Sequence, residues 1–126
     1  MKQTICLFIT SIFMLSALPA GAGEPFALVE LYTSQGCSSC PPADTFLRQL
    51  SAAAREQKKR IFPLSFHVDY WNRLGWEDPY SSPDFTLRQN LYARAFNKTS
   101  VYTPQMIING KHEFSENLVD RARVKP

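Results

Sequence analysis

Residues 26–44 read FALVELYTSQGCSSCPPAD and contain the features that decide the fold. Phe26 to Thr33 is an almost uninterrupted apolar run, which is typical of a strand buried on both faces of a sheet. Residues 34–36 break that run, and a Cys-x-x-Cys pair follows at Cys37 and Cys40. We therefore expect the two cysteines at the junction between a buried strand and a helix.

The segment before this strand has the pattern of a secretory signal, residues 1–22. Lys2 supplies the positive charge, Ile5 to Leu18 is largely apolar, and Ala20-Gly21-Ala22 is a small-x-small cleavage site. The apolar stretch is short for a bilayer span, which favours cleavage over a membrane anchor. We expect a secreted or periplasmic protein with no stable membrane anchor after cleavage, and one domain over residues 24–126.

The cysteines also indicate the kind of chemistry. Removal of the signal takes away Cys6 and leaves Cys37 and Cys40, which are only three residues apart. Exported proteins often contain disulfides, but a disulfide that closes so short a loop restrains the unfolded chain weakly. The pair is therefore better suited to redox chemistry than to a structural role.

The longest basic run is Lys58-Lys59-Arg60, which gives no reason to expect nucleic-acid binding.

Downstream of the cysteines, the pattern alternates between helix and strand. Apolar residues recur at helical spacing from Phe46 to Ala54, which predicts a helix. Ile61 to Val68 is predicted to be a strand at a sheet edge, because Pro63 cannot donate to a hydrogen-bonded ladder. Ser82 is a good helix cap and Pro83 suits the first helical position, so a second helix is expected there.

The last part of the chain predicts a hairpin and then a helix. Met106 to Ile108 and Lys111 to Phe114 flank Asn109-Gly110, a strong signal for a tight turn between antiparallel strands. Ser115 is expected to cap a final helix that runs through Val124.

The expected element order is therefore β-α-β-α-β-β-α. Alternating strands and helices imply right-handed crossovers and a parallel strand pair. We expect an α/β protein with a thioredoxin-like fold, in which flanking helices cover a four-stranded mixed sheet. In that fold Cys40 would be buried and Cys37 exposed.

The spacing of Cys37 and Cys40 suits thiol–disulfide exchange. Two intervening residues let both sulfurs meet at a helix start, where N–H groups favour the thiolate. We expect Cys37 to attack a substrate and Cys40 to resolve the mixed disulfide. Pro41 and Pro42 lack N–H groups, so the helix is expected to start as late as Cys40 or Pro41. The alternative is a cysteine pair with only a packing or structural role.

Two segments resemble glutaredoxins. One is Val29 to Thr33 together with the Cys-x-x-Cys pair, and the other is Tyr102 to Gly110, which resembles the segment around the glutaredoxin cis-proline. The resemblance implies that Pro104 is cis and faces the dithiol, and that Thr103 contacts substrate. Phe114-Ser115-Glu116 stands where glutaredoxins have a glycine-rich glutathione site, so we do not expect specific glutathione binding.

A longer resemblance is to the exported bacterial family called domain of unknown function 1223. The motifs that carry it are Tyr32 to Asp44, Phe66 to Trp71, Leu74 to Trp76 and Tyr102 to Gln105. The resemblance implies a thioredoxin-like, secreted or periplasmic protein. Members of this family usually continue well beyond the length of this chain, so a C-terminal truncation is expected.

Three further groups are candidates for roles at the site. Glu30 is the only charged residue of the first strand, and it is either a proton relay to Cys40 or an acid at the sheet rim. His67 and Asp69 could reach the site, but we favour a hydrogen-bonded pair that orders the following loop. The aromatic residues of that loop are candidates for a groove wall or, preferably, a cover over the core: Tyr70, Trp71, Trp76 and Tyr80.

These observations favour a thiol–disulfide oxidoreductase that needs no cofactor or metal. Its expected partners are thiols or disulfides of proteins or small molecules. One alternative is a copper-binding protein or metallochaperone, with His67 or His112 as a third ligand beside the two thiolates. Another is a thioredoxin-fold interaction module whose dithiol is idle. Redox direction and oligomeric state stay open at this level.

Overall fold

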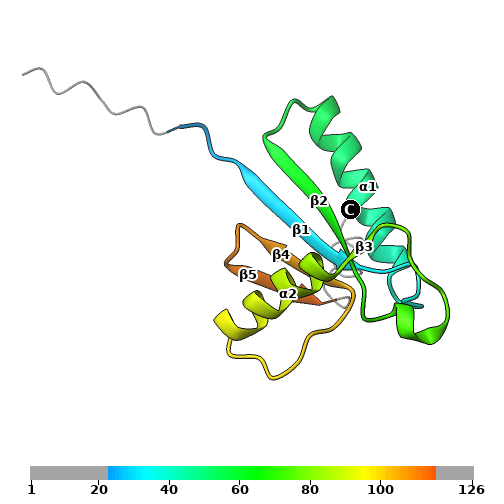
Figure 1. Ribbon diagram of the computed structural model, residues 1–126. Helices are drawn as coiled ribbons and strands as arrows, with labels where there is room; N and C mark the ends of the chain where they lie inside the picture. The colour runs from blue at the N-terminus through cyan, green and yellow to red at the C-terminus, as the bar shows by residue number, and fades with distance from the viewer. Residues whose placement is uncertain (1–22, 116–126) are drawn as a thin grey trace, which may run out of the picture.

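The computed structural model describes residues 23–115 of the chain (Figure 1). The predicted signal, residues 1–22, and the helix predicted through Val124 lie outside the described residues, except that Ser115 is the last residue of a strand. The described elements, in chain order, are β1 (Ala27–Thr33), α1 (Pro41–Glu56), β2 (Ile61–Val68), the short 3-10 helix η1 (Asn72–Leu74), β3 (Ser81–Ser82), α2 (Pro83–Ala95), β4 (Gln105–Ile108) and β5 (His112–Ser115).

A mixed sheet with the strand order β3-β2-β1-β4-β5 forms the centre of the described part. β1 runs parallel to β2 and antiparallel to β4, and β5 returns antiparallel to β4. The predicted turn joins β4 to β5: Asn109 and Gly110 have positive φ angles of 51° and 65°, a conformation that these residue types tolerate well. The architecture is of the predicted α/β class and is consistent with a thioredoxin-like fold.

The number of strands differs from the prediction, five instead of four. The additional strand, β3, has only two residues, and it pairs with His67 and Val68 at the end of β2. Two serines before a helix carry no alternating apolar pattern, so the sequence gives no sign of this strand. Because β3 covers only the end of β2, Pro63 lies on the open part of that strand, as its missing N–H requires.

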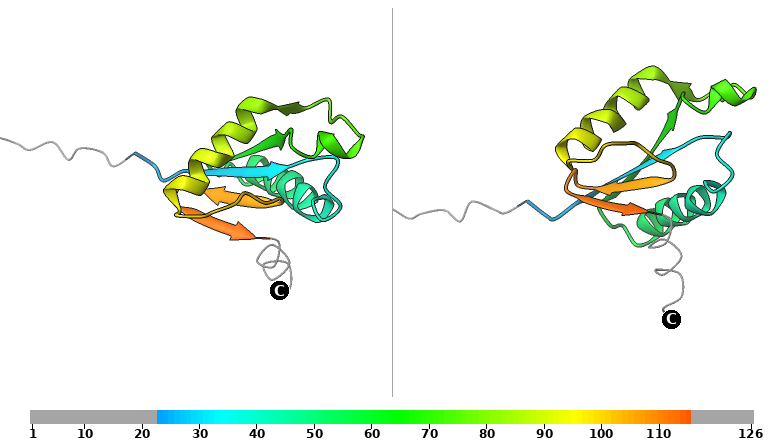
Figure 2. Two further views of the ribbon diagram at one scale, coloured as in Figure 1. Left: turned by 60° about the horizontal axis from the view of Figure 1, so that its bottom comes forward. Right: turned by 90° about the horizontal axis from the view of Figure 1, so that it is seen from below.

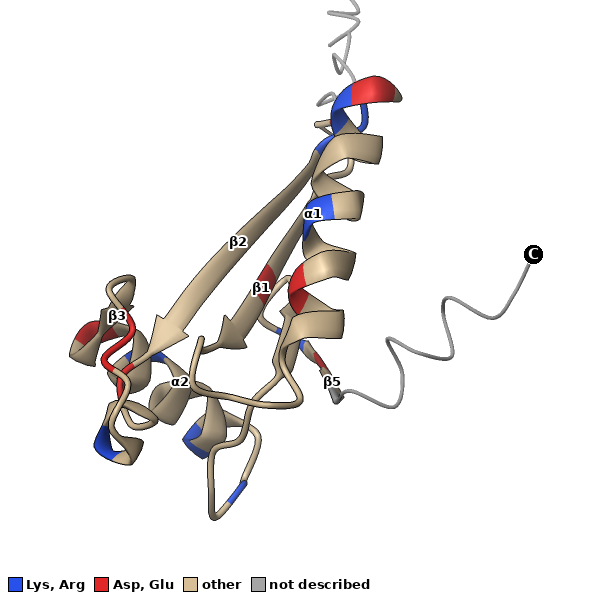
Figure 3. Ribbon diagram, turned by 90° about the vertical axis from the view of Figure 1, so that its right-hand side faces the viewer, with Lys and Arg blue, Asp and Glu red and all other residues tan. Residues whose placement is uncertain are grey.

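The two helices cover opposite faces of the sheet (Figure 2). Val29 and Leu31 of β1 pack with residues of α1 in one apolar cluster. Tyr32 belongs to a second cluster, against which Tyr92 of α2 packs. Successive side chains of a strand point to opposite faces, so Glu30 shares the α2 face with Tyr32. Glu30 is also the only Asp, Glu, Lys or Arg in β1, β2 and β4 (Figure 3).

Both helices start where the sequence predicts. Cys40 is the N-cap residue of α1, which begins at Pro41. Ser82 caps α2, because its side-chain oxygen accepts a hydrogen bond from Asp84 N at 3.2 Å. Among the described residues, no helix is both long and apolar enough to cross a membrane.

Candidate functional site

Cys37 and Cys40 lie in the turn between β1 and α1, where their sulfurs form a disulfide. Cys40 is fully buried, as predicted. Cys37 was expected to be exposed, and this expectation is wrong: only 3% of the residue is accessible. Trp71 packs against the preceding residue so closely that a Cβ atom at Gly36 would lie 3.2 Å from the Trp71 Cβ.

The turn that carries Cys37 is irregular rather than helical. Cys37 N donates to Ser34 O at 3.1 Å, and Cys40 N donates to Cys37 O at 3.3 Å. Thr33 Oγ1 at the end of β1 donates to Asp44 Oδ1 in the first turn of α1 at 2.8 Å, which fixes the strand to the helix. Cys37 therefore precedes the helix by several residues, and the α1 dipole assists its thiolate less than it would at the helix start.

The peptide bond between Thr103 and Pro104 is cis, as the resemblance implied. Pro104 is buried and directly precedes β4, whose first residue pairs with Tyr32 near the end of β1. Pro104 and the disulfide therefore lie at the same end of the sheet. The neighbouring Thr103 uses its side-chain oxygen to accept a hydrogen bond from Trp71 Nε1 at 2.8 Å.

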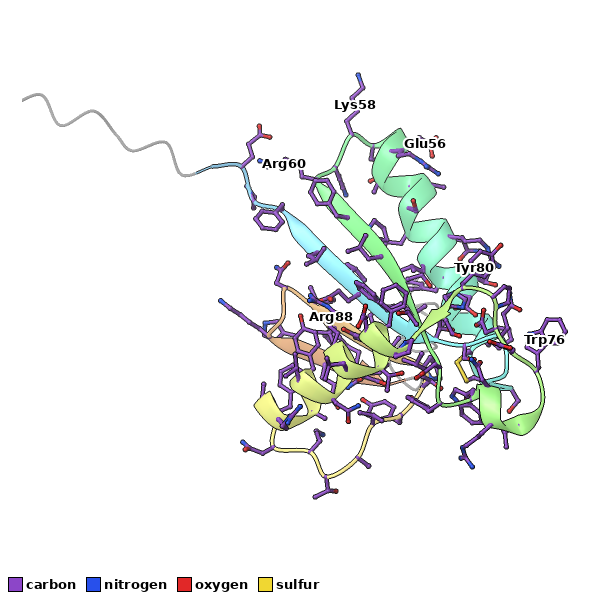
Figure 4. The ribbon with its side chains drawn as sticks, viewed as in Figure 1. Glu56, Lys58, Arg60, Trp76, Tyr80 and Arg88 are labelled. Carbon is purple, nitrogen blue, oxygen red and sulfur yellow. A yellow bond between two sulfur atoms is a disulfide. The ribbon has the colours of Figure 1, made fainter. Side chains whose placement is uncertain are left out.

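A long loop, residues 69–80, borders this end of the sheet, and we call it the aromatic loop (Figure 4). Trp71 joins it to Thr103, as described above. Trp76 Nε1 donates to Gln35 Oε1 at 3.0 Å, and Gln35 N donates to Asp78 Oδ2 at 2.8 Å. The loop is thus bonded both to the turn before Cys37 and to the residue before the cis-proline.

The predicted pairing of His67 with Asp69 is wrong. His67 Nδ1 lies 2.6 Å from Asp78 Oδ2, whereas Asp69 forms hydrogen bonds with Thr86 of α2 through its backbone N and its carboxylate. Both residues still help to order the loop, as expected, but with different partners. Asp78 lies eleven residues after His67, and no local pattern in the sequence indicates that contact.

Asp78 is a buried carboxylate with an unusually complete set of donors. Burial alone would raise its pKa, but hydrogen bonds from Gln35 N, His67 and Tyr80 N outweigh burial and lower the pKa below its ordinary value. Asp78 therefore stays ionised and connects the end of β2, the aromatic loop and the turn that leads to Cys37.

Asp78→Asn is expected to lower the free energy of unfolding at neutral pH by about 1–3 kcal/mol, since a charged acceptor is lost. A lowered pKa contributes stability above the unfolded value of 3.8, and this contribution disappears as the pH falls through the folded value. The stability gap between wild type and variant should therefore shrink below pH 3.8. Urea unfolding at pH 7 and pH 3 measures the gap, with Glu77→Gln as the exposed control. A stability gap that stays constant between pH 7 and pH 3 would contradict a lowered pKa of Asp78.

Glu30 does not lie with the disulfide. Its side chain is on the α2 face of the sheet, where Oε1 accepts from Arg88 Nε at 2.7 Å and Oε2 accepts from the Tyr92 hydroxyl. Leu31, the next residue, points to the face that α1 covers. The alternation of β1 thus separates Glu30 from Cys40, and we assign Glu30 no part in proton transfer there.

A buried glutamine on α2 supports the cis-proline segment, and no pattern in the sequence indicates this role. Gln89 Nε2 donates to Tyr102 O at 2.7 Å and to Gln105 Oε1 at 2.8 Å. Its side-chain oxygen accepts from the Tyr70 hydroxyl at 3.2 Å. Residues on both sides of Thr103 and Pro104 are therefore held by one fully buried side chain.

The suggested metal ligands do not come together. His112 pairs with Ile108, which lies opposite Val29 near the start of β1 and far along the sheet from the disulfide. His67 uses Nδ1 on Asp78. Over residues 23–115, no group of three or more His, Cys, Asp or Glu side chains is placed to hold one metal ion.

Comparison with known proteins gives a family and a solved structure. A family model described as "Protein of unknown function (DUF1223)" matches residues 28–124, a range that contains both cysteines and Pro104. The crystal structure of protein AGR_C_4864 from Agrobacterium tumefaciens is similar, with a TM-score of 0.64 and 46% sequence identity. The match covers 77% of this chain but only 43% of that protein, so this chain spans less than half of its relative's length. The chain matches none of the curated proteins.

Proposed function

Because this chain belongs to the DUF1223 family, whose description assigns no activity, we propose a function from the site itself: thiol–disulfide exchange by an exported, thioredoxin-like oxidoreductase. The observation that carries the proposal is the Cys37–Cys40 disulfide at the start of α1, at the same end of the sheet as the cis Thr103–Pro104 bond. Export is inferred from the signal-like residues 1–22.

In the disulfide form, the protein would oxidise a substrate dithiol. A substrate thiolate attacks Cys37 Sγ, the bond to Cys40 breaks, and Cys40 leaves as a thiolate that takes up a proton. A second substrate thiolate then attacks the substrate sulfur of the mixed disulfide, and Cys37 leaves. Two electrons pass from the substrate to the protein, and the substrate gains a disulfide. The same steps in reverse reduce a substrate disulfide.

Burial and chain order assign the roles within this sequence. Cys40 is fully enclosed at the N-cap of α1, whereas Cys37 lies in the preceding turn and retains slight exposure. A substrate that meets the disulfide from outside therefore reaches Cys37 first. Thr103 and Pro104 are proposed to receive the substrate backbone next to Cys37.

Turnover tests this function directly. The purified protein is mixed with a fluorogenic two-cysteine peptide, and the rate of exchange is compared with that of Cys37→Ser. We expect catalysis that is lost by at least about two orders of magnitude in the variant, because only uncatalysed exchange then remains. Equal rates for the two proteins would exclude an oxidoreductase role for this site.

Glutathione is not expected to be a specific ligand. The segment in which glutaredoxins bind its carboxylate is Phe114-Ser115-Glu116 here, and Phe114 packs against the core beside α1. Calorimetric titration of the oxidised protein with oxidised glutathione should give no saturable heat. A saturable site with one ligand per chain would show that another surface replaces the missing glycine-rich segment.

A further inference from the structure

The aromatic loop presents three large apolar side chains that thiol exchange itself does not use. Leu74, Trp76 and Tyr80 are 61%, 60% and 67% exposed. Figure 4 shows Trp76 projecting outward from the loop. The three residues belong to one loop, and exposed apolar groups gathered in one region of a soluble protein are typical of interaction sites.

Two of these residues, Trp76 and Tyr80, contact neighbouring groups although they are exposed. Trp76 Nε1 is bonded to Gln35, two residues before Cys37. Tyr80 N donates to Asp78 Oδ1 at 3.0 Å, and the Tyr80 ring lies 5.5 Å from the His67 ring. Trp76 is therefore bonded to the turn that carries the disulfide, and Tyr80 lies beside His67 at the end of β2.

The same loop also restricts access to the disulfide. Trp71 packs on Gly36 and donates to Thr103 Oγ1, so it joins the two segments on either side of the proposed substrate position. Only 3% of Cys37 is accessible in this arrangement. A thiolate reaches Cys37 Sγ only when neighbouring groups move, and Trp71 is the loop side chain bonded to both adjacent segments. A reactant that also binds the loop would favour this movement.

The charges near the loop do not favour a small anionic disulfide. Asp78 is buried and paired, and Asp69 is bonded to Thr86. Arg73 is exposed and keeps its positive charge, although its Nε donates to Tyr70 O. The exposed Glu77 balances Arg73, so the apolar residues lie on a surface without a net exposed charge. Such a surface suits an apolar chain better than a small anion.

We propose that the aromatic loop is the recognition surface for polypeptide substrates, and that its occupant is an extended segment with apolar side chains next to the reacting cysteine. This inference rests on the proposed function and names its substrate class. Docking on Leu74, Trp76 and Tyr80 displaces Trp71 from Thr103. Thr103 is then free to receive the substrate backbone, and Cys37 becomes accessible.

The test compares three reduced probes on the oxidised protein: a two-cysteine peptide flanked by Leu and Phe, the same peptide flanked by Ser and Gly, and dithiothreitol. We expect kcat/KM for the apolar peptide to exceed that for the polar peptide about tenfold or more. Trp76→Ala and Leu74→Ser should each remove most of this preference, measured as the ratio of kcat/KM for the two peptides within each variant. Leu91→Ser is the matched control, because Leu91 is 56% exposed and lies in the second half of α2, outside the loop.

A further variant tests the loop as a barrier. Trp71→Phe keeps an aromatic ring and removes the hydrogen bond to Thr103, so dithiothreitol should react several-fold faster with this variant than with wild type. An unchanged rate would contradict the barrier.

The possible outcomes separate this inference from the proposed function. Exchange with both peptides at equal rates, or a preference that neither loop substitution reduces, would overturn the recognition surface and leave the oxidoreductase function intact. Exchange with none of the probes would overturn the function and the inference together. Sedimentation of a dimer that Trp76→Ala abolishes would assign the surface to a second copy of the chain and also overturn the inference.

Discussion

Cys40→Ser is expected to accumulate mixed disulfides with its substrates, whereas Cys37→Ser is not. In the reduced protein, Cys37 attacks a substrate disulfide and needs Cys40 to release the product. Without Cys40 the reaction stops at the covalent intermediate, and without Cys37 it does not begin, because Cys40 is fully buried. Non-reducing electrophoresis of each variant after incubation with an extract of oxidised exported proteins detects the trapped species.

The pattern across the two variants is the decisive result. Wild type should show almost no trapped species, and the double variant should show none. Equal trapping by Cys37→Ser and Cys40→Ser, or none by either, would mean that the assignment of attacking and resolving thiols is wrong.

Arg88→Met is expected to lower the free energy of unfolding by about 3 kcal/mol, because it leaves the carboxylate of Glu30 buried without its cationic partner. The carboxylate is fully buried, and the Arg88 guanidinium lies 5.4 Å from the Phe66 ring centre and 5.5 Å from that of Tyr92. The neighbouring carboxylate and burial also raise the pKa of Tyr92, burial being the larger cause, so this hydroxyl stays a donor. Urea unfolding measures the loss.

Two controls identify the source of this effect. Arg94→Met, on an exposed position of the same helix, should change stability by about 0.5 kcal/mol or less. Adding Glu30→Gln to Arg88→Met should recover much of the loss, since no buried charge is then left unpaired. If the double variant is as unstable as Arg88→Met, packing of the arginine rather than the ion pair explains the result. A change in the pH dependence of Cys37 alkylation in Glu30→Gln would restore the proton-relay hypothesis.

Local sequence patterns were sufficient to predict the elements that position the site. The apolar run before Cys37, the serine cap of α2 and the Asn109-Gly110 turn all depend on contacts between residues close in the chain. The cis bond at Pro104 came from a resemblance to other proteins, because a cis proline is rare on general grounds.

The groups that complete the site could not be predicted in this way. Gln35 meets Asp78 across 43 positions of the chain, and Trp71 meets Thr103 across 32. Such contacts depend on how a loop folds back on the sheet, which no periodic pattern records. The expected exposure of Cys37 was wrong for the same reason.

Glu30 illustrates a different limit. The alternation of side chains along β1 is visible in the sequence. Which face of the strand α1 covers, however, is decided only when α1 packs on Val29 and Leu31. Arg88, the partner of Glu30, is 58 positions away in the chain, on a helix that has no clear apolar stripe.

The reduction potential of the Cys37–Cys40 couple tests the central claim most directly. The purified protein is equilibrated with glutathione or dithiothreitol redox buffers, with and without copper, and the dithiol fraction is measured by alkylation and mass spectrometry. We predict one two-electron transition between roughly −270 and −120 mV, the range of known oxidoreductases, that copper does not shift. A potential below about −300 mV, typical of structural disulfides, would contradict a redox-active site, and binding of one copper ion per reduced chain would favour a metallochaperone instead.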